Sequence, residues 1–346
     1  MRRRRILRDR RNIIIASALI IIAVTLIIVR YAVFTSNTPD QITITVAWNP
    51  GSIADDMVRA MIPSMDSQVT LQNITGANGA DGANEVFRSE RNGTHLLSTS
   101  LSAFVTSEAM GFSEASHNEW TAWLCAFAPV IVVTAGNSPY NDMDGLLTDI
   151  RHNPGRVRCA DDGAGTAGFI AAELFSSGGN LEIDHISFSG SNSVITALEG
   201  SEADFAILLS VQVIDHLRSG RLKALGSFTK EEITLYINDT EIMIPSAAGL
   251  NDRFDSILPL GEYYGIFIPA DTSQAKSNSI ETIIKKSVAS DLFNIFTSNA
   301  GLINVTPDKS KNAETIESFC STVCWTLYDV GYLPVNPDTL GIQRKQ

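Results

Sequence analysis

Three glycine-bearing loops constrain the fold of this chain more than any other feature. Each follows a short β-branched or apolar run and opens a helical pattern: WNPGSIADDMVR follows Gln41–Ala47, GANGADGANEV follows Val69–Asn73, and DDGAGTAGF follows Arg156–Ala160. This strand–loop–helix order predicts an α/β fold in which helices cover a sheet. Ligands of open α/β sheets bind at the carboxyl ends of the strands, so we expect the three loops to border a binding site.

The same alternation continues through the remainder of the chain. Helices are indicated by apolar residues at helical spacing, and strands by short apolar or alternating runs bounded by turn residues. Further strands are predicted at His95–Thr99, Val130–Thr134, Ile183–Phe188, Ala203–Leu209, Leu222–Phe228 and Tyr264–Pro269. Further helices are predicted at Asp142–His152, Gly168–Ser176, Val194–Leu198, Ser279–Thr297 and Ala313–Tyr328.

A basic N-terminus precedes a long apolar run, Ile13–Val29, in which only Ser17 and Thr25 are polar. The run is just long enough to span a bilayer, and neither a small-residue cleavage site nor a lipid-bearing cysteine follows it. The arginines should stay in the cytoplasm. We therefore expect residues 1–35 to be a transmembrane signal anchor, with the body on the extracytoplasmic side of the cell membrane. A cleaved signal peptide, which would release the body into the periplasm, is the alternative.

The rest of the chain is strongly acidic. The net charge is −12, but eight of the 26 basic residues and only one of the 38 acidic ones lie in the first 30 positions. Nucleic-acid binding needs a basic face, so we expect no nucleic-acid partner. Hydrophobic residues make up 44% of the chain and charged residues 18%, which is typical of a globular protein with a proper core.

Four cysteines, Cys125, Cys159, Cys320 and Cys324, could pair in an oxidising compartment. Cys320 and Cys324 lie on one face of a predicted helix, which is poor geometry for a disulfide. No histidine stands at metal-ligand spacing from them. We interpret all four as buried thiols and expect no metal site.

The glycine-rich loops do not match the nucleotide-binding patterns. Neither GANGADG nor GAGTAG has the G-x-G-x-x-G spacing, and no G-K-[ST] follows a glycine run, so no cofactor is expected. A G-x-S-x-G nucleophile turn is also missing from the sequence, and the five histidines are scattered. Asp161 and Asp162 could act as paired carboxylates, but no partner acid is indicated. We predict no catalytic residue, and a membrane-anchored hydrolytic enzyme is the less favoured alternative.

The ordered motifs from about Ile42 to Ile342 resemble the solute-binding proteins of tripartite tricarboxylate transporters, the Bug family. Residues 46–59, VAWNPGSIADDMVR, keep Gly51, Asp55 and Arg59 of the family's V-P-F-x-x-G-G-x-x-D-x-x-A-R. Residues 73–83, NITGANGADGA, resemble N-x-x-G-A-x-G-x-x-G-A. Residues 160–173, ADDGAGTAGFIAAE, and 185–204, HISFSGSNSVITALEGSEAD, align with two later family motifs.

The departures from the family pattern concern the ligand. Ser52 replaces a glycine, Asp161 replaces a serine, Phe169 replaces a histidine, and Phe188–Ser189 replaces a tyrosine–lysine pair. Asp161 could repel a second carboxylate of a ligand, or it could pair with a ligand amine. Alternatively, Asp161 or Asp162 only caps the helix that begins near Thr166 or points to solvent.

The resemblance implies a two-lobe, type II periplasmic-binding-protein fold, in which each lobe is a doubly wound sheet and a hinge closes the lobes on the ligand. Residues 41–138 plus 265–346 would form the first lobe and 139–264 the second, with crossings near Ala135–Tyr140 and Gly261–Gly265. The ligand would be a small carboxylate-bearing molecule, such as a di- or tricarboxylate, an amino acid or an aromatic acid. The partners would be the transporter membrane subunits.

We expect the ligand to be held by backbone N–H groups and small polar side chains of the loops. Arg59 points off its helix beyond the first turn, which favours a structural ion pair. Trp48 could cover the ligand or could be a buried aromatic of the lobe interface. The candidate ligand-binding residues are Trp48, Asn49, Ser52, Asp55, Gly76, Asn78, Gly79, Asp161, Gly163, Gly165, Thr166, Ala167, Ser189 and Ser191.

A different functional class stays open on the sequence. A membrane-tethered sensor could bind the same ligand and signal to a partner protein. Only about eleven residues precede the apolar run, so such a signal would have to pass to another chain.

Overall fold

The computed structural model describes residues 19–25, 39–237 and 240–344. One mixed sheet runs through the molecule in the order β2-β1-β3-β11-β4-β7-β5-β6, and β8 and β12 also pair with β4. The strands are β1 (Gln41–Val46), β2 (Gln68–Asn73), β3 (His95–Ser100), β4 (Trp120–Ala135), β5 (Arg158–Asp161), β6 (Asp184–Ser187), β7 (Phe205–Leu209), β8 (Leu222–Ser227), β11 (Gly261–Pro269) and β12 (Ile303–Asn304). A separate hairpin joins β9 (Ile233–Ile237) to β10 (Thr240–Ile244).

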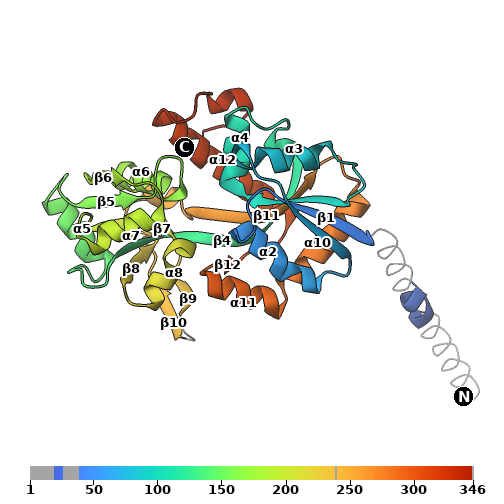
Figure 1. Cartoon of the computed structure of the whole chain (residues 1–346), viewed down its shortest axis with the longest axis horizontal. Helices are drawn as coiled ribbons and strands as arrows, with labels where there is room; N and C mark the ends of the chain where they lie inside the picture. Colours follow the sequence, from blue (N-terminus) through green and yellow to red (C-terminus); the bar gives the residue numbers. More distant parts are fainter. Residues whose placement is uncertain (1–18, 26–38, 238–239, 345–346) are drawn as a thin grey trace, which may run out of the picture.

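The sheet has two halves, which lie side by side and are joined by the long strands β4 and β11 (Figure 1). The first half contains β1, β2, β3, β11 and β12, and the second contains β5, β6, β7 and β8. β4 pairs with β11 over Trp120–Pro129 and with β7 and β8 over Val130–Ala135. The change of partner thus falls inside one strand, before the crossing that we predicted after Ala135. The division into lobes stays a prediction.

Helices cover both faces of each half. On the first half these are α2 (Ile53–Met61), α3 (Ala80–Arg88), α4 (Leu101–Ala109), α10 (Gln274–Val288), α11 (Asp291–Ala300) and α12 (Lys309–Asp329). On the second half they are α5 (Met143–His152), α6 (Ala167–Gly179), α7 (Ser191–Glu199), α8 (Ser210–Arg218) and α9 (Asp252–Ser256). Short 3-10 turns are η1 (Ile62–Ser64), η2 (Ala77–Gly79), η3 (His117–Glu119) and η4 (Pro337–Leu340). The prediction of an α/β fold is confirmed.

Most predicted elements appear within a few residues of their expected bounds, and two differ for physical reasons. β4 is sixteen residues long and almost wholly buried, so its apolar run carries no alternation that would reveal its full length. The predicted helix Ser279–Thr297 is two helices, because Ser290 caps α11 by accepting a hydrogen bond from the Phe293 N–H. The β9–β10 hairpin was not predicted.

The predicted membrane anchor lies mostly outside the described residues. Of Ile13–Val29, only residues 19–25 are described, and these are helical and exposed. Over the described ranges, the structure contains no helix with both the length and the hydropathy that crossing a membrane requires.

The core confirms the interpretation of the cysteines. Cys125, Cys159, Cys320 and Cys324 are all buried and unpaired. In the second half, the ring of Phe175 lies against those of Phe205, Phe228 and Phe254, and all four side chains are fully buried. This aromatic cluster holds α6 and α9 on the sheet.

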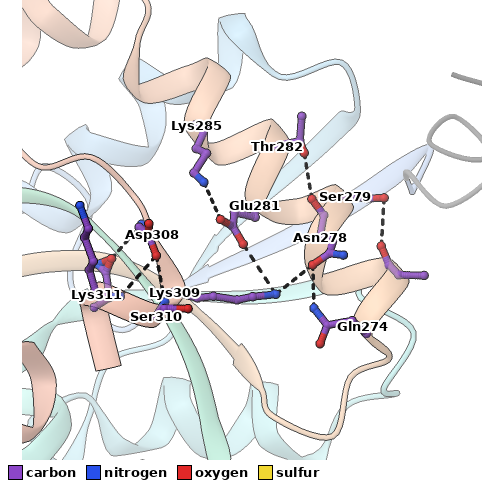
Figure 2. A network of polar contacts seen from close by, with 12 residues as sticks. Gln274, Asn278, Ser279, Glu281, Thr282, Lys285, Asp308, Lys309, Ser310 and Lys311 are labelled. Atoms are coloured by element: carbon purple, nitrogen blue, oxygen red, sulfur yellow. Dashed lines mark hydrogen bonds and ion pairs between the residues drawn. The ribbon is translucent and has the colours of Figure 1, made fainter. Parts of the chain in front are cut away.

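A polar network connects α10 to the start of α12 (Figure 2). The Lys309 ammonium lies 2.9 Å from Oδ1 of Asn278 and 3.7 Å from a carboxylate oxygen of Glu281, which also binds Lys285. Asp308 caps α12 through the N–H groups of Ser310 and Lys311. Exposed pairs of this kind stabilise a fold only weakly, so the network orients α12 more than it stabilises it.

Candidate functional site

A cavity of about 340 Å³ lies between the two halves of the sheet. Four helices begin at it: α2 and α4 from the first half, and α6 and α8 from the second. β11 adds Glu262 and Tyr264 from the connection between the halves. The residues that line it are Trp48, Ser52, Ile53, Ala54, Asn78, Ser100, Ser102, Ala103, Thr106, Asp162, Gly165, Thr166, Ala167, Leu209, Gln212, Glu262 and Tyr264. The structure thus brings all three glycine-bearing loops to one cavity.

The first loop presents the start of α2 to the cavity. Ser52 caps the helix by accepting a hydrogen bond from the Asp55 N–H at 3.3 Å. In the part of the chain that the structure describes, no group accepts from the N–H groups of Ile53 and Ala54, which line the cavity. Trp48 also lines it and donates from Nε1 to the Thr99 hydroxyl at 3.2 Å. Of the predicted residues here, Asn49 is exposed and does not line the cavity.

Asp55, another predicted ligand contact, is fully buried behind the loop and is the centre of a polar network whose Arg59 side chain is half exposed. Its carboxylate accepts hydrogen bonds from the Gly51 N–H (2.9 Å), from Arg59 Nε (2.7 Å) and from Asn73 Nδ2 (3.0 Å). Burial by itself would raise the pKa of Asp55, but these donors hold it below its usual value. The predicted ion pair of Arg59 is confirmed, and the network shapes the loop rather than lining the cavity.

Arg59→Ala should destabilise the fold, since it leaves the buried Asp55 carboxylate without its charged donor. The pKa of Asp55 is lowered in the folded protein, so this contribution is present at neutral pH and disappears as the pH falls through the folded-state pKa. Urea unfolding at pH 7 and near pH 3 measures it. Equal losses at the two pH values would contradict the prediction.

The second loop reaches the cavity only through Asn78. This residue has a φ of 56°, and its amide donates to the Thr106 hydroxyl at 3.0 Å. Gly76 has a φ of 140°, and a Cβ there would lie 2.0 Å from the Asp81 carboxylate. Gly79 has a φ of 88°. The two glycines therefore permit the turn, whereas only Asn78 of the three lines the cavity.

In the third loop, Asp161 points into the second half of the molecule. Its fully buried carboxylate accepts from the Gly163 N–H at 2.8 Å, from the Ser187 hydroxyl at 2.9 Å and from His185 Nε2. Burial would lower the pKa of His185, but the hydrogen bond and charge of Asp161 and the nearby Glu173 raise it. Asp161 thus orders the loop and does not line the cavity. The neighbouring Asp162 does.

Gly163 and Gly165 have φ values of 111° and 88°, which favour glycine at both positions of this turn. Several of the predicted ligand donors already form hydrogen bonds within the loop itself. The Gly163 N–H binds Asp161, the Thr166 N–H donates to the Gly163 carbonyl, and the Thr166 hydroxyl lies within hydrogen-bond distance of Asp162. The N–H groups of Gly165 and Ala167 have no acceptor among the described residues. Gly163 does not line the cavity, while Gly165, Thr166 and Ala167 do.

The last two predicted residues lie away from the cavity. Ser189 is exposed, and its carbonyl accepts from the Ser193 hydroxyl at 3.1 Å. Ser191 is the first residue of α7. Neither belongs to the lining.

Glu262 is the most informative residue that sequence reasoning missed. It is 5% exposed, and its carboxylate accepts from the Ser102 N–H at 3.0 Å and from the Ser102 hydroxyl at the start of α4. Burial raises its pKa to about 7, although hydrogen bonds from Ser102 and neighbouring backbone groups act in the opposite direction. Ser102 and Glu262 are 160 positions apart, so no local pattern could have connected them.

Gln212 and Thr106 were also missed. Gln212 is near the start of α8, and its Nε2 donates to the Asp162 carboxylate at 2.7 Å. Thr106 faces the cavity from α4, a helix whose bounds we did not predict. The sequence signal available for Gln212 was its position just after a buried strand, where helix starts meet a crevice.

A second cavity of about 350 Å³ adjoins the first at Ser102 and Ala167. Apolar residues of α6, α12 and the segment 257–261 form much of its wall. It touches only two of the helix starts, at Ser102 and Ala167, so we take the first cavity as the candidate ligand site.

Comparison with known proteins agrees with this geometry. Residues 52–319 match the family model described as the tripartite tricarboxylate transporter family receptor, which is most of the chain. The chain belongs to this receptor family. A curated relative, the "UPF0065 protein in tcbD-tcbE intergenic region" of Pseudomonas sp. strain P51, is 25% identical over 257 residues, which are 72% of this chain and 74% of the relative.

Solved structures of this kind share the fold of the receptor. A TctC solute-binding protein from Polaromonas has a TM-score of 0.72 at 16% identity, with 84% of this chain and 98% of that chain covered. A Rhodopseudomonas palustris protein solved with adipate has a TM-score of 0.60 at 15% identity (86% and 99% covered). MatC of the same species, with bound malate, has a TM-score of 0.55 at 19% identity (84% and 97% covered). These likenesses establish the periplasmic-binding-protein-like fold.

Proposed function

We propose that this receptor captures a small carboxylate-bearing metabolite between the two halves of its sheet and delivers it to the membrane subunits of a tripartite tricarboxylate-type transporter. The observation that carries the proposal is the cavity at which four helices begin. Helix starts present free N–H groups and a partial positive charge, which favour a carboxylate. The adipate and malate in two structures of the same fold support this ligand class.

The connection between the halves suits a protein that binds and releases. The cavity takes lining residues from both halves, and only β4 and β11 of the sheet run between them. A small rotation about these strands would open the cavity to solvent, as in hinge closure. The residues that line it include no histidine and no cysteine, and the family is one of receptors, so we infer binding without catalysis.

Ligand binding is testable by thermal unfolding of the purified full-length protein with di- and tricarboxylates, amino acids and aromatic acids. A ligand at one hundred times its dissociation constant stabilises the folded state by about 2.7 kcal/mol, which should raise the melting temperature measurably. A chemically altered ligand after incubation would instead indicate an enzyme. If no compound raises the melting temperature, the proposal is wrong.

Gly165→Val should weaken ligand binding far more than Thr166→Ala. A Cβ at Gly165 would lie 2.8 Å from the ring of Tyr332, which follows α12, and its φ of 88° disfavours any side chain. Thr166→Ala removes a single hydroxyl that already bonds within the loop. Titration calorimetry on both variants measures the difference.

Tyr332→Ala is the matched control for steric exclusion. Gly165→Ala alone should weaken ligand binding through both the contact with the Tyr332 ring and the backbone strain. In the double variant Gly165→Ala/Tyr332→Ala, the ring is absent and only the strain remains, so much of the lost affinity should return. A folded Gly165→Val protein that binds as tightly as the parent would show that the third loop lies outside the ligand site.

We also propose that the body of the protein acts on the extracytoplasmic side of the membrane, held there by the apolar run Ile13–Val29. The full-length protein should then sediment with membranes and keep its N-terminus. A soluble product that begins near Tyr31 or Ser36 would establish cleavage instead.

A further inference from the structure

Two buried carboxylates line the cavity without a counter-ion. Asp162 is 8% exposed and Glu262 is 5% exposed. Neither takes part in an ion pair within the described residues, and no lysine, arginine or histidine is among the described residues that line the cavity. Buried carboxylates in proteins are normally paired with a cation, because leaving water costs a charged group several kcal/mol. This absence of a protein cation suggests that the ligand itself supplies the positive charge.

All recorded hydrogen bonds to these carboxylates come from neutral donors. Asp162 accepts from Gln212 Nε2 at 2.7 Å and from the Thr166 hydroxyl, and Glu262 accepts from the N–H and hydroxyl of Ser102. Neutral donors orient a carboxylate but leave its charge uncompensated. A ligand with two or three carboxylates and no cation would therefore add negative charge to a cavity that already holds two acids.

The helix starts at the cavity differ in whether their N–H and capping groups already bind a carboxylate of the protein. Glu262 takes the N–H at the start of α4, and Asp162 binds the capping threonine of α6. At the start of α2, the N–H groups of Ile53 and Ala54 have no acceptor among the described residues. The buried acid of that turn, Asp55, already has Arg59 as its cation. At the start of α6, the Gly165 and Ala167 N–H groups also have no acceptor among the described residues, but the Asp162 carboxylate already places a negative charge at that helix start. The cavity thus has an anion-accepting end at α2, whose acid is paired with Arg59, and a cation-accepting end at Asp162 and Glu262.

We propose that this receptor selects a small zwitterion, whose ammonium group binds Asp162 and Glu262 and whose carboxylate binds the start of α2. The inference rests on the proposed function and narrows its ligand class to amino-acid-like compounds. It also assigns recognition of the ligand amine to Asp162 and Glu262 instead of Asp161. The sequence suggested Asp161 for this role, whereas in the structure Asp161 is committed to His185 and Ser187.

The test compares matched pairs of ligands that differ only in the amine. Titration calorimetry of the full-length protein would use aspartate against succinate, glutamate against glutarate, alanine against propionate, and 5-aminopentanoate against pentanoate. For at least one pair, the amino member should bind at least tenfold more tightly than its partner. The pair with the largest difference in affinity is then titrated into each variant.

Glu262→Gln and Asp162→Asn keep the shape of each side chain and remove its charge. Each should weaken binding of the amino member by tenfold or more, while binding of the partner without the amine stays the same or improves. Glu241→Gln removes an exposed acid from the β9–β10 hairpin and should change neither affinity. Thermal unfolding of every variant confirms that it is folded.

The outcomes separate the inference from the proposed function. If the partners without the amine bind the parent as tightly as the amino members, the inference is wrong and the receptor function stands. The same conclusion follows if the two variants weaken both members of a pair equally. If no member of any pair binds, the proposed ligand class fails, and the inference fails with it.

Discussion

Phe175→Ala should lower the free energy of unfolding by about 3–5 kcal/mol, the range for loss of a fully buried aromatic side chain. The Phe175 ring lies 5.3 Å from that of Phe228, 6.0 Å from that of Phe254 and 6.2 Å from that of Phe205. All four side chains are fully buried, so truncation leaves a cavity that the surrounding rings cannot readily fill. Because Phe175 is on α6, whose start lines the candidate ligand cavity, we expect ligand affinity to fall as well.

Chemical denaturation of parent and variant measures this loss, with Phe112→Ala as the control. Phe112 is 45% exposed, and its truncation should change the free energy of unfolding by less than about 1 kcal/mol. Comparable losses in the two variants would mean that the aromatic cluster is not the core that the structure indicates.

Glu262→Gln should make the protein's stability less dependent on pH between 5 and 8. The pKa of Glu262 is about 7 in the folded protein, against an ordinary value of 4.5, because burial disfavours the charged form. The folded state therefore holds this proton more tightly than the unfolded chain does. Stability is lost as the pH rises from 4.5 to about 7, and the full cost, about 3 kcal/mol, is present above that range.

The measurement is urea unfolding of parent and variant, without ligand, at pH 5 and pH 8. Relative to the parent, Glu262→Gln should gain about 2–3 kcal/mol between the two pH values. The other ionisable groups that line the cavity, Asp162 and Tyr264, are present in both proteins, so the difference isolates Glu262. A gap between parent and variant that stays constant from pH 5 to pH 8 would contradict a raised pKa.

The same residue connects stability to recognition. An uncompensated carboxylate weakens the empty receptor at neutral pH, and a ligand ammonium would remove that cost when it binds. At equal ligand concentration, the parent should therefore gain more stability than Glu262→Gln from an amino-acid ligand. The buried carboxylate thus lowers the stability of the empty receptor and raises its affinity for a ligand that carries an ammonium group.

The order of strands and helices, the three loops and the family were determined by the sequence itself. Short β-branched runs, capping residues and glycines act within a few positions, so a local pattern predicts β1, α2, β2 and the start of α6 closely. The positive φ of Gly163 and Gly165 follows from the same local chemistry. The cap of α6 was predicted wrongly: Thr166, and not Asp161 or Asp162, caps this helix by accepting a hydrogen bond from the Phe169 N–H.

Only the tertiary structure decided which side chains meet. Asp161 and Asp162 are adjacent in the sequence, yet one faces His185 inside the second half and the other lines the cavity, because consecutive residues of a turn point in different directions. Glu262 and Ser102 come together across 160 positions, through the pairing of β11 between β3 and β4. Long-range strand pairing depends on the burial of whole faces of a sheet, which no short stretch of sequence encodes. The position of Glu262 in the candidate ligand cavity is a result of that pairing.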